Sequence, residues 1–99
     1  MSYRALIAEH LRLAILQILE QDSDYAHNEA VLQSALQAVG HGVSADRVRA
    51  ELAWLAEQGL LLVEQAPGQL QIARLSGRGA DTALGRAIVP GVARPRPGG

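Results

Sequence analysis

The feature that most constrains the fold is a glycine that separates a helical segment from two strand-like segments. Gly59 follows an apolar helical pattern, and glycine ends helices because it adopts the left-handed conformation at little cost. Two segments suited to β-structure come next, Leu60–Gln65 and Gln69–Leu75, and the sequence Ala66-Pro67-Gly68 between them is typical of a turn. The sequence therefore predicts a helix that leads directly into a β-hairpin.

Two further helices are predicted before that one. The first covers residues 4–21, where apolar side chains at helical spacing form one stripe: Ile7, Leu11, Ala14, Ile15, Ile18 and Leu19. Leu6 and Leu13 lie at or beyond the edges of this stripe, so the apolar arc is wider than a single contact requires. Either the domain itself covers this helix on two sides, or the helix also packs against a partner chain.

The second helix is expected after a polar loop over Asp22–His27. Asn28 is its predicted N-cap, and Glu29 lies in its first turn, where the helix dipole favours a negative charge. Its buried face is predicted to consist of Val31, Leu32, Ala35, Leu36 and Val39. Gly40 and Gly42 then end this helix.

Ser44 is the predicted N-cap of the third helix, whose inward stripe contains Val48, Leu52 and Leu55. After the hairpin, a short helix is expected over Ser76–Arg86. The last residues, 88–99, contain proline, arginine and glycine without a pattern, and we expect a flexible tail that is either disordered or lies along the surface. The predicted organisation is one mainly α domain with a small β-hairpin, an α+β fold, over residues 1–87, followed by this tail.

Composition limits the environment and the chemistry of the chain. The 99 residues contain no cysteine, which excludes disulfides and thiolate metal sites. The first apolar run is too short and too polar for a membrane span, so a soluble cytoplasmic protein with no membrane partner is expected. All nine basic residues are arginine, and five of them follow residue 66, against Asp81 as the one acid there. Any anionic partner is therefore expected to meet the C-terminal third first.

Several segments resemble the winged-helix regulators of MarR and ArsR type. Ser44–Val48, Leu52–Leu55 and Glu57–Leu61 resemble their recognition helix and first wing strand. Ile72–Gly79 resembles the exit from the wing, with Ser76 where threonine is usual. The chain is also similar to small winged-helix proteins carried by Mu-like prophages. The resemblance implies a winged helix-turn-helix fold, with three helices, a two-stranded wing and a short C-terminal helix.

The same resemblance implies double-stranded DNA as the partner and transcriptional regulation of phage or prophage type as the role. The third helix would enter the major groove, where arginine can fork onto guanine, and the wing and the tail arginines would hold the backbone. The tail sequence Arg94-Pro95-Arg96-Pro97 is either such an extended arm or only a solubilising end. Carried over by position, the DNA-contacting residues are Ser44, Ala45, Arg47, Arg49 and Ala50 on the helix, Gln65, Gln69 and Arg74 on the wing, and Arg78 after it.

The charge of the chain and of its third helix leaves open an alternative to DNA binding. Strong DNA-binding domains are usually basic, whereas this chain has a pI of about 6.3 and its third helix has more acids than arginines. Arg47 and Arg49 could instead be solvated ion-pair partners of Glu51 and Asp46. The alternative function is a protein–protein adaptor, with a homodimer through the first helix possible for either function. The partner-interface candidates are Leu6, Leu13 and Trp54.

No motif in the sequence is typical of an enzyme, a cofactor site or an effector site. No phosphate-binding loop, zinc-protease helix or nucleophile elbow is present. Asp22, Asp24 and His27 are potential metal ligands, but such residues in a loop are usually only solvated. We therefore expect neither catalysis nor a cofactor, a metal ion or a small-molecule effector.

Overall fold

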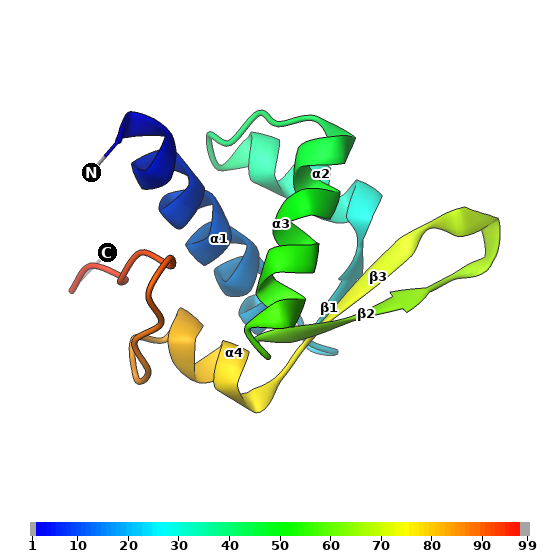
Figure 1. Ribbon diagram of the computed structural model, residues 1–99. Helices are drawn as coiled ribbons and strands as arrows, with labels where there is room; N and C mark the ends of the chain where they lie inside the picture. The colour runs from blue at the N-terminus through cyan, green and yellow to red at the C-terminus, as the bar shows by residue number, and fades with distance from the viewer. Residues whose placement is uncertain (1, 98–99) are drawn as a thin grey trace.

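The computed structural model describes residues 2–97, which form four α-helices and a three-stranded antiparallel sheet (Figure 1). The helices are α1 (Tyr3–Gln21), α2 (Glu29–Ala38), α3 (Ala45–Glu57) and α4 (Gly77–Ala83). The strands are β1 (Ala26–Asn28), β2 (Leu61–Gln65) and β3 (Gln71–Leu75), and the 3-10 turn η1 (Pro67–Gln69) joins β2 to β3. The predicted order of three helices, a hairpin and a short helix is confirmed, and so is the α+β class.

Strand β1 is the element that the sequence did not predict. The sheet has the order β1-β3-β2, so β3 lies in the centre and pairs with β1 through registers such as His27 opposite Ala73. The N–H of Leu75 also donates to the carbonyl of Tyr25, just before β1. A three-residue strand of Ala, His and Asn has no alternation of apolar and polar side chains. The expected loop over Asp22–His27 was therefore wrong for its last two residues.

Helix α1 runs through the centre of an aliphatic core. Its Leu11, Ile15, Leu16 and Leu19 are at most 1% exposed. The leucines packed around them come from α2, α3 and the start of the hairpin: Leu32, Leu36, Leu52, Leu55, Leu60 and Leu61. Each such burial contributes roughly 1.5–3 kcal/mol, so the core is stable without phenylalanine. Leu13 is also buried, which means that the domain itself covers α1 on two sides over most of its length.

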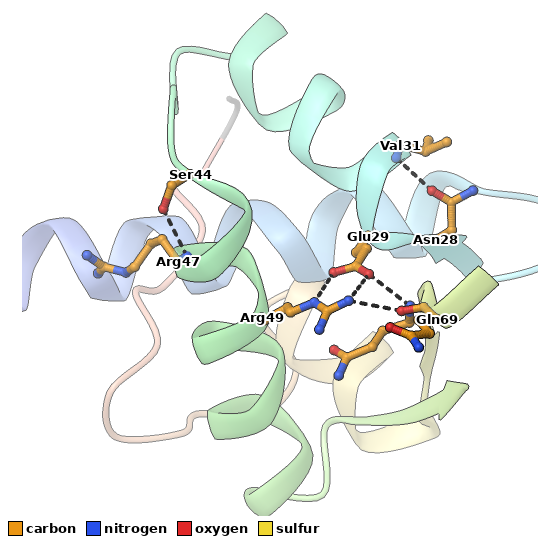
Figure 2. Close-up of polar contacts among 8 residues, drawn as sticks. Asn28, Glu29, Val31, Ser44, Arg47, Arg49 and Gln69 are labelled. Carbon is orange, nitrogen blue, oxygen red and sulfur yellow. Dashed lines mark hydrogen bonds and ion pairs between the residues drawn. The ribbon is translucent and has the colours of Figure 1, made fainter. Parts of the chain in front are cut away.

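The predicted caps position α2 and α3. The side chain of Asn28 accepts from the N–H of Val31 at 2.9 Å, and Ser44 accepts from the N–H of Arg47 at 3.1 Å (Figure 2). Gly59 has a φ of +75°, so the predicted switch from helix to strand occurs there. Helix α4 ends at Ala83, three residues before the expected position, and Gly85 follows with a φ of +80°.

Residues 88–97 form a segment that we call the C-terminal strap. The sequence predicted a flexible tail from residue 88, whereas in the structure Val89 and Val92 are only 3% and 7% exposed and belong to the core. The N–H of Ala93 donates to the carbonyl of Glu9 on α1 at 3.1 Å. Two valines spaced three residues apart among glycine and proline give no periodic signal, which is why the sequence did not reveal this packing.

No helix in residues 2–97 combines the length and the apolarity that a transmembrane span requires.

Candidate nucleic-acid interface

The two arginines of α3 point in opposite directions. Arg47 and Arg49 are two residues apart, which on an α-helix separates their side chains by about 200°. Figure 2 shows Arg47 on one side of α3 and Arg49 on the other, directed toward Glu29. The side of α3 between them carries the exposed residues Asp46, Ala50, Ala53 and Glu57. The expectation that both arginines share one groove-facing surface is therefore wrong, because their spacing does not match the helical period.

Arg49 ties α3 to α2 and to the hairpin. Its Nε and Nη2 atoms donate to the two carboxylate oxygens of Glu29 at 2.5 and 2.6 Å, and Nη2 also donates to the carbonyl of Gln69 at 3.0 Å. The N–H of Gln71 on β3 donates to the same carboxylate at 3.0 Å. The side chain of Glu29 is only 8% exposed, whereas that of Arg49 is 45% exposed. This cluster fixes the turn end of the hairpin against α2 and α3.

The hydrogen bonds between Arg49 and Glu29 favour the charged forms of both side chains. The hydrogen bond from Arg49 is the main cause that holds the pKa of Glu29 below its ordinary value of 4.5; burial opposes it and the N–H of Gln71 reinforces it. In turn, the hydrogen bond with Glu29 raises the pKa of Arg49. The ion-pair partner of Arg49 is thus Glu29 and not Asp46, the partner that the charge pattern had suggested.

Arg47 belongs to a second cluster, around the buried carboxylate of Glu51. The Nε of Arg47 and the Nε of Arg12 each donate to one oxygen of Glu51 at 2.7 Å. Arg12 also lies over the ring of Trp54, 3.9 Å from its centroid, and donates to the carbonyl of Gly91 at 2.9 Å. The interpretation of Arg47 as a partner of Glu51 is confirmed, and this cluster joins α1, α3 and the C-terminal strap.

The hairpin and the residues after it hold the remaining DNA-contact candidates. Arg74 pairs with Glu64 across the hairpin at 3.2 Å, with both side chains about half exposed. Gln69 lies in the hairpin turn with a φ of +63°. Arg78 donates to the carbonyl of Gln58 at the C-terminal end of α3. Ser44 is occupied as the cap of α3, and Ala50 is exposed.

The three partner-interface candidates do not form one surface. Leu13 is buried in the core, and Trp54 is covered by Arg12 and by Gly91 of the strap. Leu6 is 40% exposed, next to Ile7 and near Tyr3 at the start of α1. An exposed apolar surface on α1 is thus confined to its first two turns.

Sequence reasoning missed the two buried carboxylates as organising groups. Glu29 was assigned only to the helix dipole, and Glu51 only to a surface ion pair, although they are 7% and 5% exposed. Each is an acid on the buried side of an otherwise apolar helix, and that position was the available signal. The arginine that each one binds comes from a distant part of the chain, so it could not be inferred from spacing.

Comparison with known proteins finds relatives of the chain in a phage and in a bacterium. It is 48% identical over 92 residues to a protein of Escherichia phage Mu named "Uncharacterized protein gp26", and the match covers 93% of this chain and 94% of the relative. The chain belongs to the family of phage Mu gp26. An "Uncharacterized protein" of Haemophilus influenzae strain Rd is 37% identical to this gp26-family chain over 78 residues, 79% of the chain and 76% of the relative. No protein-family model and no solved structure matches the chain.

The potential metal ligands of this gp26-family chain are accounted for by an internal pair. The Nε2 of His27 lies 2.9 Å from a carboxylate oxygen of Asp22, which links the start of the loop to β1. Within residues 2–97, no three histidine or acidic side chains are grouped in a way that could hold a metal ion. His27 and Asp22 therefore stabilise the turn that leads into β1.

Proposed function

We propose that this gp26-family protein is a winged-helix DNA-binding protein, a transcriptional regulator of phage type that acts in the cytoplasm, and not an enzyme. In this proposal α3 enters the major groove of double-stranded DNA, and the β2–β3 hairpin lies as a wing beside it. The observation that carries the proposal is the cluster of Glu29, Arg49 and Gln69, which holds the turn end of the hairpin against α3. A helix and a hairpin fixed in this way can approach a duplex as one rigid unit.

The exposed side of α3 suits close approach to base edges. Ala50 and Ala53 are exposed and have short side chains, so the helix backbone can lie deep in a groove. Arg47 and Arg49 act as supports that orient α3. Moving Arg49 would leave the buried carboxylate of Glu29 without its ion-pair partner, and moving Arg47 would leave that of Glu51 with Arg12 alone. Sequence readout then depends on the short side chains of α3 and on the glutamines of the hairpin.

A charge introduced on that exposed side tests the proposal. We expect mixed-sequence duplex DNA to bind in a fluorescence anisotropy titration, with log affinity falling as log salt rises between about 50 and 200 mM. Ala50→Glu and Ala53→Glu should weaken binding at least tenfold through repulsion of phosphates. Ala38→Glu, at an exposed position on α2, is the matched control and should bind like the unmodified protein. No binding at low salt with micromolar protein would overturn the proposal.

A second candidate function, a protein–protein adaptor, is favoured by the same ion pairs. Three of the proposed DNA-contact residues, Arg47, Arg49 and Arg74, already face carboxylates. The exposed residues Asp46 and Glu57 then give α3 an acidic surface. An adaptor would use this surface, or the apolar start of α1 with Leu6 exposed, which also suits a homodimer. Light scattering that finds only a monomer would remove the homodimer from both candidates.

A further inference from the structure

The arginines of this chain divide into two groups by their surroundings. Four of them pair with carboxylates: Arg12 and Arg47 with Glu51, Arg49 with Glu29, and Arg74 with Glu64. Those at the C-terminal end do not. Within residues 2–97, Arg86, Arg94 and Arg96 are exposed and have no carboxylate oxygen within 4.0 Å. Arg4 on α1 and Arg78 on α4 have no carboxylate partner either, and Arg78 donates to the carbonyl of Gln58. Three of the five arginines without such a partner in residues 2–97 thus lie after α4.

A contact between the turn after α4 and the C-terminal strap brings Arg86, Arg94 and Arg96 into one region. Pro95 lies against Gly85, where a Cβ atom built on the glycine would be 3.0 Å from Cγ of the proline. Arg86 follows Gly85 directly, and Arg94 and Arg96 flank Pro95. Since the backbone of residue 85 touches residue 95, these three exposed side chains start from neighbouring points of the surface. We call them the strap arginines.

The strap arginines lie on the opposite side of α3 from the hairpin. Gly91 packs against the ring of Trp54 on α3 and accepts a hydrogen bond from Arg12, which fixes the course of the strap along this flank. The hairpin is fixed to the other flank through the contact of Arg49 with Gln69. Figure 1 shows the strap and the hairpin on the two sides of α3. A duplex lying across α3 would therefore be flanked by both.

We propose that the strap arginines contact the phosphate backbone of duplex DNA bound across α3, opposite the hairpin. This inference rests on the proposed function and names the residues that supply its electrostatic attraction. The guanidinium group matches phosphate geometry with two parallel donors. The prolines on either side of Arg96 keep the segment extended, and the buried Val89 and Val92 anchor it, so little conformational entropy is lost when phosphate binds.

Salt dependence of binding tests the proposal. Each arginine that contacts a phosphate contributes about 0.9 to the slope of log affinity against log salt. The triple variant Arg86→Gln, Arg94→Gln, Arg96→Gln should therefore lose about 0.9 of slope for each residue that binds, and at least tenfold in affinity at low salt. The corresponding triple lysine variant keeps the charges and should keep most of the slope. Arg4→Gln, which removes the charge of an exposed arginine at the start of α1, is the control and should leave the slope unchanged.

Two results would overturn the inference, and they are distinguishable. If the unmodified protein binds the duplex but the triple glutamine variant has the same slope and affinity, the proposed function survives and the strap arginines are not phosphate contacts. If the unmodified protein does not bind duplex DNA at low salt, the proposed function fails and the inference fails with it. None of the three side chains forms a hydrogen bond within residues 2–97, so the triple glutamine variant should unfold at the same temperature as the unmodified protein. With equal unfolding temperatures, any loss of binding comes from the loss of charge.

Discussion

Arg49 on α3 and Arg94 on the C-terminal strap have the same side chain in opposite surroundings. Arg49 donates two hydrogen bonds to the buried carboxylate of Glu29 and a third to the carbonyl of Gln69, whereas Arg94 is exposed and has no carboxylate nearby within residues 2–97. An arginine that neutralises a buried carboxylate is part of the fold, because its departure leaves that carboxylate unpaired. The number of arginines in a segment therefore overstates the cations that a partner can use.

Among the arginine–carboxylate pairs that belong to the fold, removal of Glu51 is expected to have the largest effect on stability. Its carboxylate accepts from both Arg12 and Arg47, and the side chain is 7% exposed. Glu51→Ala leaves two guanidinium groups without a partner, so the free energy of unfolding measured in urea should fall by about 2–3 kcal/mol. Glu57→Ala, an exposed position on the same helix, should change it by less than about 0.5 kcal/mol. Equal losses in the two variants would mean that Glu51 is an ordinary surface residue.

The attachment of the strap can be broken at Gly91. A Cβ atom there would be 2.6 Å from Cζ2 of Trp54, and the φ of +95° is unfavourable for any other residue. We expect Gly91→Ala to cost about 1–2 kcal/mol of stability and to shift the fluorescence of Trp54 toward that of an exposed ring. Gly42→Ala is the matched control, because nothing lies within 4 Å of that position. An unchanged emission spectrum in Gly91→Ala would contradict the packing of the strap on Trp54.

The ion pair of Glu29 predicts a dependence of stability on pH. Its pKa is below the ordinary value of 4.5 in the folded protein, mainly because of the hydrogen bond from Arg49. The group therefore stabilises the fold above about pH 4.5, and this contribution is lost as pH falls below that value and the carboxylate is protonated. Urea unfolding between pH 7 and pH 3 should show a steeper loss for the unmodified protein than for Glu29→Gln. If stability fell equally with pH in the two proteins, protonation of Glu29 would not be coupled to unfolding.

The smallest effect is expected for the exposed pair of the hairpin. The side chains of Arg74 and Glu64 are 48% and 49% exposed, so water and salt screen their attraction. Arg74→Gln should change the free energy of unfolding by no more than about 0.5 kcal/mol. If Arg74→Gln lowered the free energy of unfolding as much as Glu51→Ala does, exposed and buried ion pairs would contribute equally to stability.

The helices and the hairpin could be predicted because their signals are local. Asn28 and Ser44 cap helices within three residues of their own positions, and Gly59 ends α3 through its own backbone conformation. The strand β1 and the strap gave no such signal. β1 has three residues and depends on β3, which is more than forty positions away, and the strap depends on Trp54 and on α1.

The candidate site was predicted in part. The arginines and Ser44 lie on or next to α3 and the hairpin as expected, but their roles depend on contacts between distant segments. Arg49 binds Glu29, and Arg12 reaches both Glu51 and Gly91. Charge patterns along a sequence cannot reveal which carboxylate is buried beside which arginine, and that pairing decides whether a cation is available.

The central claim, that α3 arginines belong to the fold while strap arginines do not, is tested most directly by thermal unfolding of two single variants. Arg49→Gln and Arg94→Gln remove the same charge and are compared by circular dichroism at neutral pH in the same buffer. We expect a Tm several degrees lower for Arg49→Gln and an unchanged Tm for Arg94→Gln. Equal Tm values for the two variants would contradict it.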